Sequence, residues 1–340
     1  MKSFIGKNQI YIIAEIGINH NGNLNIAKKL IDYASAAGCN AVKFQTYITD
    51  DIILRSQELA SYQKITNFKN QYNMLKNYEL SFDDFRYLKK YCLKKKITFL
   101  STPFDNKSAF FLNKIKVPFF KISSADIDNY HLLNFIKKFK KPIIISTGMS
   151  DEKKIKKTIN FLKLNRNKLA ILHCVSEYPT VLKNTNLGFI NKLKNYGYDF
   201  GVSDHTTGNE FAIASVALGA KIVEKHITLS NKSTGPDHIS SLEVKYLKKF
   251  VSTVRNLFHS LKDIKKKKTK IEIENLDKTQ RRLFLTKNIK EYKEIKYDDI
   301  LPLRSNNKKL ILAKDTFKIL GKKTKKKLYK NNGIEWKNIK

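Results

Sequence analysis

Short apolar runs recur along the chain, and each is followed by a longer stretch with apolar residues at helical spacing. A strand followed by an amphipathic helix is the repeating unit of a parallel sheet. Eight such runs occur, at residues 10–14, 41–45, 97–101, 119–123, 142–146, 169–174, 198–203 and 221–226. Eight strand–helix units within about 250 residues are typical of a (β/α)8 TIM barrel, so the pattern predicts this α/β fold.

The segment between the first two runs predicts a helix with both ends encoded in the sequence. Asn23 is suited to cap the N-terminus, and Gly38 is suited to end the helix. The apolar residues of the segment share one helical face: Leu24, Ala27, Leu30, Ile31 and Ala34. Residues 209–219 repeat this design before the eighth run.

Three segments depart from the repeat. Residues 47–80 form a long polar and aromatic stretch after the second run, which we expect to act as a lid over the barrel mouth. Residues 263–279 are highly charged and poorly periodic, which favours a linker or an exposed helix. We therefore expect a barrel domain over residues 1–262 and a small, mainly β domain over residues 280–340.

The chain is strongly basic, with 66 Lys and Arg against 30 Asp and Glu and a formal net charge of +36. Clustered cations can bind nucleic acid by releasing counterions from phosphates. However, only seven of the basic residues are Arg, and the lysines are spread over the whole sequence. There is no recognisable recognition helix or RNA-binding aromatic motif, so nucleic acid ranks last among the expected partners.

Cellular location can be inferred from the cysteines and from the apolar runs. Cys39, Cys92 and Cys174 lie far apart without a CxxC pair, which indicates neither a disulfide framework nor a thiolate metal cluster. No run approaches the roughly 18 apolar residues of a membrane-spanning helix, and the N-terminus lacks the pattern of a signal peptide. We expect a cytoplasmic protein without a membrane partner.

Polar side chains gather at the ends of all eight predicted strands. The active site of a (β/α)8 barrel lies at the C-terminal ends of its strands, so polar residues at these positions indicate a site. In strand order they are Glu15; Lys43 and Gln45; Ser101 and Thr102; Lys121, Ser123 and Ser124; Ser146 and Thr147; His173 and Ser176; Ser203, Asp204 and His205; and Glu224 and His226.

His205 and His226 end adjacent strands at matching depth, so their imidazoles are expected to reach a common point. Two histidines with carboxylates nearby suit a divalent ion such as Mn²⁺, and the alternative is a pair of hydrogen-bonded histidines. Lys43 and Lys121, among several hydroxyls, suit a phosphate or a carboxylate, and the alternative is ordinary surface lysine. Asp237, in a Gly-Pro turn beyond the last strand, faces the same mouth or caps a helix.

The ordered motifs AEIGINHNG, AVKFQTY, LSTPFD, FKISSAD, IISTGMS, LHCVSEYPT, GVSDHTTG, EKHITL and GPDHISSLE resemble the sialic acid synthase family. These enzymes condense phosphoenolpyruvate with an N-acetylated hexose to make nonulosonic acids. The match extends from about residue 10 to about residue 245. The tail resembles, less closely, the antifreeze-like (SAF) domain of that family.

The resemblance implies roles for individual residues of this chain. His205 and His226 are expected to bind a divalent metal, Mn²⁺ in the first place and otherwise Mg²⁺ or Co²⁺, with Glu15 as the catalytic carboxylate beside it. Phosphoenolpyruvate is expected to contact Lys43, Thr102, Lys121, Ser124, Ser146 and Ser203. The acceptor sugar is expected to contact Gln45, Asp126, Ser176, Tyr178 and Asp237. Arg304 is the match to an arginine that reaches the acceptor across a domain-swapped homodimer.

The sequence departs from the family at three positions near these contacts. Asp126 stands where many relatives have Glu, Ser176 replaces a common Asn, and the residues after Arg304 read SNN where the family has Pro-Gly. The acceptor stays open between N-acetylmannosamine, which gives N-acetylneuraminate, and a 2,4-diacetamido-6-deoxyhexose, which gives legionaminate or pseudaminate. A Schiff-base aldolase of the same barrel, with Lys43 or Lys121 as the amine nucleophile, is the rival enzyme.

Overall fold

The computed structural model describes residues 4–6, 9–262 and 265–340. The chain divides into two compact units, residues 1–262 and residues 263–340. No helix among the described residues is both long and apolar enough to cross a membrane.

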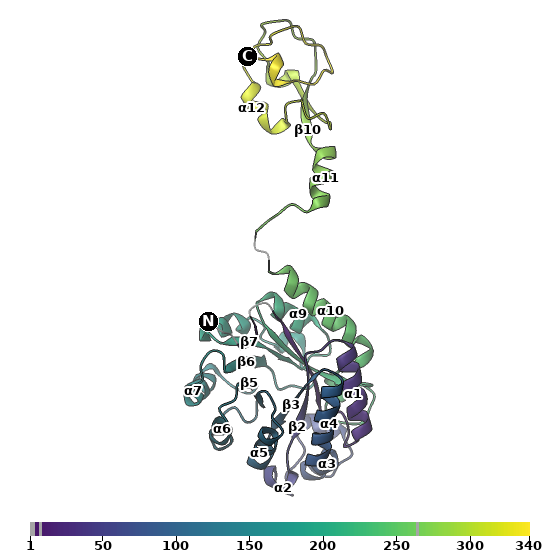
Figure 1. Cartoon of the computed structure of the whole chain (residues 1–340), viewed down its shortest axis with the longest axis vertical. Coiled ribbons are helices and arrows are strands. Elements are labelled where there is room, and N and C mark those ends of the chain that lie inside the picture. Colours follow the sequence, from purple (N-terminus) through teal and green to yellow (C-terminus); the bar gives the residue numbers. More distant parts are fainter. Residues whose placement is uncertain (1–3, 7–8, 263–264) are drawn as a thin grey trace. The chain divides into compact units, whose positions relative to one another are not determined.

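The first unit is a closed barrel of eight parallel strands, as the sequence predicted (Figure 1). The strands are β1 (Tyr11–Gly17), β2 (Ala41–Thr46), β3 (Thr98–Pro103), β4 (Phe120–Ile122), β5 (Ile143–Ser146), β6 (Leu169–Cys174), β7 (Asp199–Asp204) and β8 (Ile222–Thr228). They are hydrogen-bonded in the order β3-β2-β1-β8-β7-β6-β5-β4, and contacts between β3 and β4 close the circle. A two-residue strand, β9 (Leu242–Glu243), pairs in parallel with the end of β8.

Helices surround the strands. They are α1 (Leu24–Ala36), α4 (Phe82–Lys94), α5 (Asn106–Lys114), α6 (Tyr130–Lys137), α7 (Glu152–Leu162), α8 (Phe189–Leu193), α9 (Glu210–Ala217) and α10 (Val244–Ser260). The Asn23 side chain accepts hydrogen bonds from the backbone N–H groups of residues 25 and 26, which confirms the predicted cap of α1. The predicted apolar face is buried at Ala27, Leu30, Ile31 and Ala34.

The barrel interior is apolar below and polar at the C-terminal mouth. One buried apolar cluster contains inward-facing residues of the strands, below the mouth. These residues are Ile13, Ala41, Leu100, Ile144, Ala170, Leu172 and Ile222. Because side chains on a strand alternate, the next inward position lies two residues further on. Those positions are Glu15, Lys43, Thr102, Ser146, Cys174 and Glu224, so a polar layer rests directly on the apolar floor.

The long segment after β2 is irregular, with α2 (Thr49–Ile52), a 3₁₀ turn (Ser61–Ile65) and α3 (Gln71–Tyr78). It has an apolar cluster of its own, separate from the main barrel core. The buried members are Ile18, Tyr47, Met74 and Tyr78, and the partly buried members are Ile52, Leu59, Phe68, Leu75 and Phe104. The segment is therefore packed as a layer, and we call residues 47–80 the lid segment.

The second unit is a small domain built around an antiparallel pair, β10 (Arg281–Leu285) and β11 (Ile300–Arg304). Isolated bridges and α12 (Thr316–Ile319) enclose an apolar core of its own, which includes Leu283, Ile311 and Ile334. Residues 270–279, within the stretch expected as a linker, form α11 (Lys270–Thr279). None of the α11 residues is buried, and the helix begins with a capping box between Thr269 and Glu272.

Candidate active site

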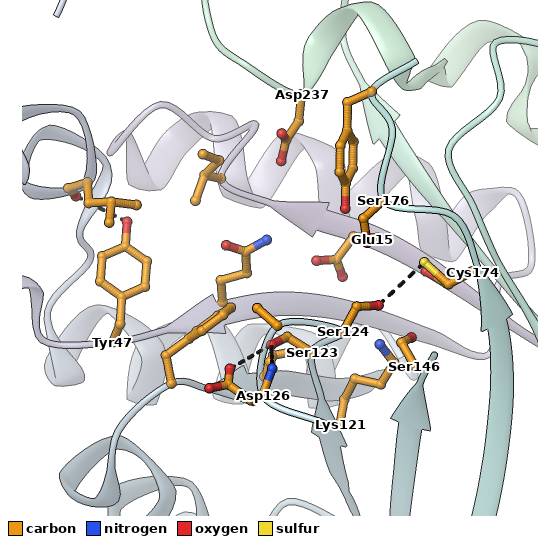
Figure 2. A pocket seen from close by; sticks show the side chains of 18 of the residues that line it. Glu15, Tyr47, Lys121, Ser123, Ser124, Asp126, Ser146, Cys174, Ser176 and Asp237 are labelled. Atoms are coloured by element: carbon orange, nitrogen blue, oxygen red, sulfur yellow. Dashed lines mark hydrogen bonds between the residues drawn. The ribbon is translucent and has the colours of Figure 1, made fainter. Parts of the chain in front are cut away.

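A cavity of about 630 Å³ opens at the C-terminal ends of the barrel strands. It brings together every barrel residue to which the sequence assigned a catalytic, metal or substrate role: Glu15, Lys43, Gln45, Thr102, Lys121, Ser124, Asp126, Ser146, Ser176, Tyr178, Ser203, His205, His226 and Asp237. Figure 2 shows side chains from several strands and loops converging on this space. The gathering of these residues at one mouth is observed, whereas their individual roles stay predictions.

The buried polar layer is organised around two lysines and two carboxylates. Lys43 Nζ lies 2.9 Å from Glu15 Oε2 and 3.7 Å from Glu224 Oε1. Lys121 Nζ lies 3.3 Å from the same Glu224 oxygen. The Ser203 hydroxyl donates to Glu224 Oε1 at 2.7 Å. Glu224 on β8 is the common partner of both lysines, and it therefore connects β8 with β2 and β4.

The surroundings of the two carboxylates set their pKa values apart. Burial raises the pKa of Glu15 to about 7, although the neighbouring Lys43 opposes this shift. Burial also opposes the ionisation of Glu224, but Lys121 and Lys43 outweigh it and lower the pKa of Glu224 to about 2. Glu15 can exchange a proton near neutral pH, whereas Glu224 stays ionised and opposes the burial that lowers the pKa of Lys121.

Hydroxyl groups complete the inner end of the cavity. Lys43 Nζ donates to Thr102 Oγ1 at 3.1 Å, and the Gly148 backbone N–H donates to Ser124 Oγ at 3.0 Å. Ser146 Oγ is buried and has no hydrogen-bond partner in the described structure. An unpaired buried hydroxyl beside two lysines is available to an anionic ligand.

Two glycines allow the site residues to approach one another. A Cβ atom on Gly148 would lie 2.2 Å from Ser176 Oγ and 2.8 Å from Ser124 Oγ, so a side chain cannot be placed there. Gly17 adopts φ +52°, and its Cβ would lie 3.2 Å from Glu15 Oε1 and 3.4 Å from both Gln45 Nε2 and His226 Cε1. Gly17 thus permits a close arrangement of residues from three adjacent strands.

The two strand-end histidines meet in space, with ring centroids 5.4 Å apart. His205 Nδ1 lies 2.7 Å from the Val175 carbonyl, so this nitrogen carries a proton and donates it to the carbonyl oxygen. Burial opposes a charged His205 ring, but Cys174 and the Val175 carbonyl outweigh it and raise the pKa of His205. His226 Nδ1 is buried without a hydrogen-bond partner, 3.9 Å from Asp237 Oδ2. Burial holds the pKa of His226 well below its usual value, so the ring is neutral.

These two imidazoles fit a divalent metal in their neutral forms, because a metal ligand must have a free lone pair; binding of the ion would displace the second proton from His205. The unpartnered His226 nitrogen is the observation that favours a ligand at this point. Among the described residues, no group of three or more His, Cys, Asp and Glu side chains is arranged to hold an ion. A metal held by His205 and His226 therefore needs oxygen ligands from water or substrate to complete its coordination.

Asp126 and Asp237 are the acidic groups between the inner end and the lid segment. Asp126 accepts hydrogen bonds from Ser123 Oγ at 2.6 Å and from Asn129 Nδ2 at 3.0 Å. Asp237 is buried, and burial raises the pKa of its carboxyl to about 6. Both side chains offer acceptor oxygens to hydroxyl or amide donors of a bound molecule.

Sequence reasoning missed part of the site and misplaced four residues. Glu224 was expected at the mouth but was given no role, and Cys174 was noted only as a cysteine, yet both line the cavity. Ser101, Thr147 and Asp204 were expected at the mouth but do not line it. His173 was expected at the mouth but faces outward, where Nε2 lies 2.7 Å from the Thr185 carbonyl. Alternation along β6 could have revealed this, because neighbouring residues on a strand face opposite sides.

The lid segment supplies residues that sequence analysis did not single out. Tyr47, Ile52, Tyr62, Met74 and Leu75 all line the cavity. The Tyr62 ring stacks on Tyr178 with centroids 5.0 Å apart. Arg304, in contrast, is exposed at the end of β11 in the second unit, opposite Arg281. Its expected contact with substrate stays a prediction.

Comparison with known proteins agrees with this geometry. The NeuB family model matches residues 30–266. This chain belongs to the NeuB family. It is 40% identical to N,N'-diacetyllegionaminic acid synthase of Campylobacter jejuni, over 82% of this chain and 86% of that protein. Human N-acetylneuraminate-9-phosphate synthase is 32% identical, over 94% of this chain and 89% of the human protein.

A solved structure supports both the fold and the family. The N-acetylneuraminic acid synthetase of Leptospira borgpetersenii, crystallised in complex with citrate, superposes with a TM-score of 0.71 at 34% identity. The match covers 80% of this chain and 92% of that one. The chain is therefore a NeuB-family protein with a TIM-barrel catalytic fold, in a family that includes sialic and legionaminic acid synthases.

Proposed function

We propose that this protein condenses phosphoenolpyruvate with the aldehyde of an N-acetylated hexose, forming a sialic-acid-type sugar acid and releasing phosphate. The observation that carries this proposal is the buried lysine pair, Lys43 and Lys121, in one cavity with the unpaired Ser146 hydroxyl and the imidazoles of His205 and His226. Membership of the NeuB family supports the same reaction, since relatives are named as synthases of such acids.

Lys43 and Lys121 bind the anionic groups of phosphoenolpyruvate at the inner end of the cavity. The hydroxyls of Thr102, Ser124 and Ser146 donate to its phosphate and carboxylate oxygens, and Ser203, whose hydroxyl donates to Glu224, contacts it as well. Glu224 lies beside both lysines and favours their charged forms before the substrate arrives. Holding carbon 3 of phosphoenolpyruvate at attack distance from the aldehyde converts an encounter of two molecules into a reaction within one complex, which is worth several kcal/mol or more.

His205 and His226 would hold a divalent ion, with Mn²⁺ the first candidate and Mg²⁺ or Co²⁺ the alternatives. When bound, the ion supplies Lewis-acid polarisation of the acceptor aldehyde. Gln45, Asp126, Ser176, Tyr178 and Asp237 contact the hydroxyl and acetamido groups of the sugar. These residues orient the aldehyde carbon toward phosphoenolpyruvate.

The bond changes balance as follows. Carbon 3 of phosphoenolpyruvate forms a bond to the aldehyde carbon, whose oxygen gains a proton, and carbon 2 is left electron-poor. A water molecule adds to carbon 2 and loses one proton, which leaves a hydroxyl on that carbon. Phosphate then leaves with the electrons of its C–O bond, and the hydroxyl loses its proton to become the keto oxygen of the product. Glu15 accepts the proton of the water, because its pKa of about 7 matches a general base near neutral pH.

The small C-terminal domain is assigned the role of an SAF domain in a domain-swapped homodimer, with Arg304 reaching the acceptor in the partner's barrel. This assignment rests on sequence resemblance and on the exposure of Arg304, which leaves its guanidinium free to meet another copy. The protein is assigned to the cytoplasm, where phosphoenolpyruvate is made.

A Schiff-base aldolase is the second candidate, because burial lowers the pKa of Lys121 as an amine nucleophile requires. Borohydride reduction in the presence of pyruvate distinguishes the two. The synthase gives an unchanged mass, whereas an aldolase gains a stable pyruvyl adduct on lysine. An adduct that is lost in Lys121→Arg would replace the synthase proposal.

The direct test is phosphate release from phosphoenolpyruvate with Mn²⁺ and an N-acetylated hexose. The expected result is release that needs both substrates and stops when EDTA is added. A product analysed by mass spectrometry should contain the three carbons of pyruvate added to the sugar. No release with N-acetylmannosamine, its 6-phosphate or any 2,4-diacetamido-6-deoxyhexose would contradict the proposal.

A further inference from the structure

A buried ion pair lies directly behind the two strand-end histidines, on the outward face of β7 and β8. Asp204 and Lys225 stand opposite each other in the register of these strands, and Lys225 Nζ lies 2.8 Å from Asp204 Oδ2. Lys225 is 1% exposed and Asp204 is 0% exposed. Asp204 precedes His205 and Lys225 precedes His226. Because neighbouring residues on a strand face opposite sides, each charge lies behind one imidazole.

The Lys225 ammonium also organises the loop after β7. Its Nζ donates to the Thr206 carbonyl at 2.5 Å and to the Gly208 carbonyl at 2.7 Å, with the Thr206 hydroxyl oxygen farther away at 3.4 Å. Together with Asp204 Oδ2, these carbonyls give the three ammonium protons three acceptors. Asp204 Oδ1 accepts from the backbone N–H and the hydroxyl of Thr206, both at 2.8 Å. Residues 204–208 are therefore wrapped around one buried cation, and His205 lies within this loop.

Stability alone is a poor explanation for charges at this place. The same outward face is apolar at Val202, Val223 and Ile227, which belong to the main buried cluster, and α9 and α10 pack against these strands. Moving two charges out of water carries a penalty that their attraction does not always repay, and apolar side chains of similar size often stabilise such a site equally well. What the ion pair adds is a fixed geometry of the loop, because each proton of the ammonium has one partner.

The ion pair acts on the site only through the histidines. Asp204 and Lys225 do not line the cavity, whereas His205 and His226 do, with ring centroids 5.4 Å apart. Metal–ligand distances tolerate deviations of only about 0.2 Å, so an ion shared by two imidazoles depends on their spacing. Asp204 and Lys225 join the loop that carries one ring to the strand that carries the other, and this connection fixes that spacing.

We propose that Asp204 and Lys225 are a positioning pair, which holds the His205 and His226 imidazoles at the spacing that one divalent ion requires. This inference rests on the proposed function and adds to it two residues that touch neither the ion nor a substrate. Loss of the pair should weaken metal binding first. The binding of phosphoenolpyruvate should be affected less, because Lys43 and Lys121 belong to the inward face of other strands.

The test measures the binding of Mn²⁺ to the metal-free, full-length protein by titration calorimetry. A single replacement would leave one buried charge without its partner and would destabilise the fold, so both charges are removed together in Asp204→Leu/Lys225→Met. This double variant should keep a Tm close to that of the wild type. Its Kd for Mn²⁺ should nevertheless be at least roughly 10-fold higher, as is found when residues that orient metal ligands are changed. Phosphate release by the variant should need more Mn²⁺ and recover at saturating Mn²⁺, with an unchanged KM for phosphoenolpyruvate.

Lys221→Met is the matched control, because Lys221 pairs with Asp199 at 2.8 Å at the opposite end of the same two strands. This variant should bind Mn²⁺ as the wild type does. Thr206→Val removes only a hydroxyl of the loop and leaves no charge unpaired, so it gives a second measurement if the double variant does not fold. Its Kd for Mn²⁺ should also be higher than that of the wild type.

The outcomes separate the two proposals. A folded double variant with the wild-type Kd for Mn²⁺ overturns the positioning role and leaves the proposed function standing. The same holds for a Thr206→Val variant with the wild-type Kd where the double variant is unfolded, and for a Lys221→Met variant that loses Mn²⁺ binding to the same extent as the double variant. Wild-type protein that releases no phosphate with any N-acetylated hexose counts against the proposed function itself.

Discussion

The Tyr178 ring lies over the His205 imidazole, with centroids 4.2 Å apart and ring planes inclined by 30°. Tyr62 of the lid segment stacks on Tyr178 at 5.0 Å. Three rings from two loops and one strand end thus form a continuous stack at the cavity. The lid segment is connected through this stack to one of the two histidines assigned to the metal.

Removing the outer ring of the stack should weaken acceptor binding. Tyr62→Ala is expected to raise KM for the acceptor roughly 2- to 10-fold with a smaller change in kcat, since a stacked aromatic pair is worth about 0.5–1.5 kcal/mol. Tyr62→Phe keeps the ring and should restore the wild-type KM. Tyr72→Ala, in the lid segment but outside the cavity lining, serves as the control. Equal KM values for Tyr62→Ala and wild type would show that the stack does not act on the acceptor.

The metal assignment predicts a loss that can be measured without turnover. His226→Ala should weaken the binding of Mn²⁺ alone by roughly 100-fold or more, measured by titration calorimetry or by the electron paramagnetic resonance of the free ion. Thermal unfolding of the metal-free protein should change little, because His226 Nδ1 has no hydrogen-bond partner to lose. His131→Ala, at an exposed position of α6, is the matched control. Mn²⁺ binding that survives His226→Ala would remove this residue from the metal site.

The barrel was predictable because its signal is local. Each strand is a short apolar run, and inward alternation places Glu15 and Lys43 on one face without knowledge of the fold. The partnership of Glu224 with Lys43 and Lys121 was not predictable, because it joins β8 to β2 and β4, which are not neighbours in the sheet.

The lid residues could not be predicted for a different reason. Residues 47–80 have no sustained period, so nothing in their pattern says which of several tyrosines faces the cavity. Tyr62 reaches Tyr178 only through the tertiary path of the chain. His173 was predictable but was predicted wrongly. It was expected at the mouth because it lies at a strand end, whereas alternation along β6 already places its side chain on the outward face.

Acid should destabilise the fold in part through His20. This ring is buried, Nδ1 accepts from the Gly22 backbone N–H at 3.0 Å, and burial lowers its pKa to about 4. Because the unfolded value is about 6.5, the contribution of neutral His20 is complete above pH 6.5 and is lost as the pH falls toward 4. The loss is on the order of 3 kcal/mol. His20→Asn keeps an acceptor but does not titrate.

Denaturant unfolding at several pH values tests this prediction. Between pH 6.5 and pH 4 the free energy of unfolding should fall less steeply with pH for His20→Asn than for the wild type. The difference between the two slopes corresponds to at most one proton taken up on unfolding. Other buried groups titrate in both proteins and cancel in the comparison. Parallel curves for the two proteins over this range would be incompatible with a neutral His20 in the fold.

Replacing Glu224 by Gln should make the fold depend on an anionic ligand. Among the described residues, Lys121 forms one ion pair, and its partner is Glu224. Glu224 also lies close to Lys43. Removing one partner of a buried charge pair costs about 3–5 kcal/mol, because the remaining charge stays buried without compensation. Phosphoenolpyruvate brings negative charge to the same place and offsets that loss. The rise in Tm on adding it should therefore be larger for Glu224→Gln than for the wild type.

Glu152→Gln provides the comparison, since Glu152 forms an exposed ion pair with Lys192 on the barrel surface. Such pairs contribute little, so this variant should resemble the wild type both in Tm and in its response to phosphoenolpyruvate. If Glu224→Gln also resembled the wild type in both respects, the lysines would have to be neutral in the free protein. In that case the inner end of the cavity would hold no preformed positive charge, and the binding of phosphoenolpyruvate would need another source of attraction.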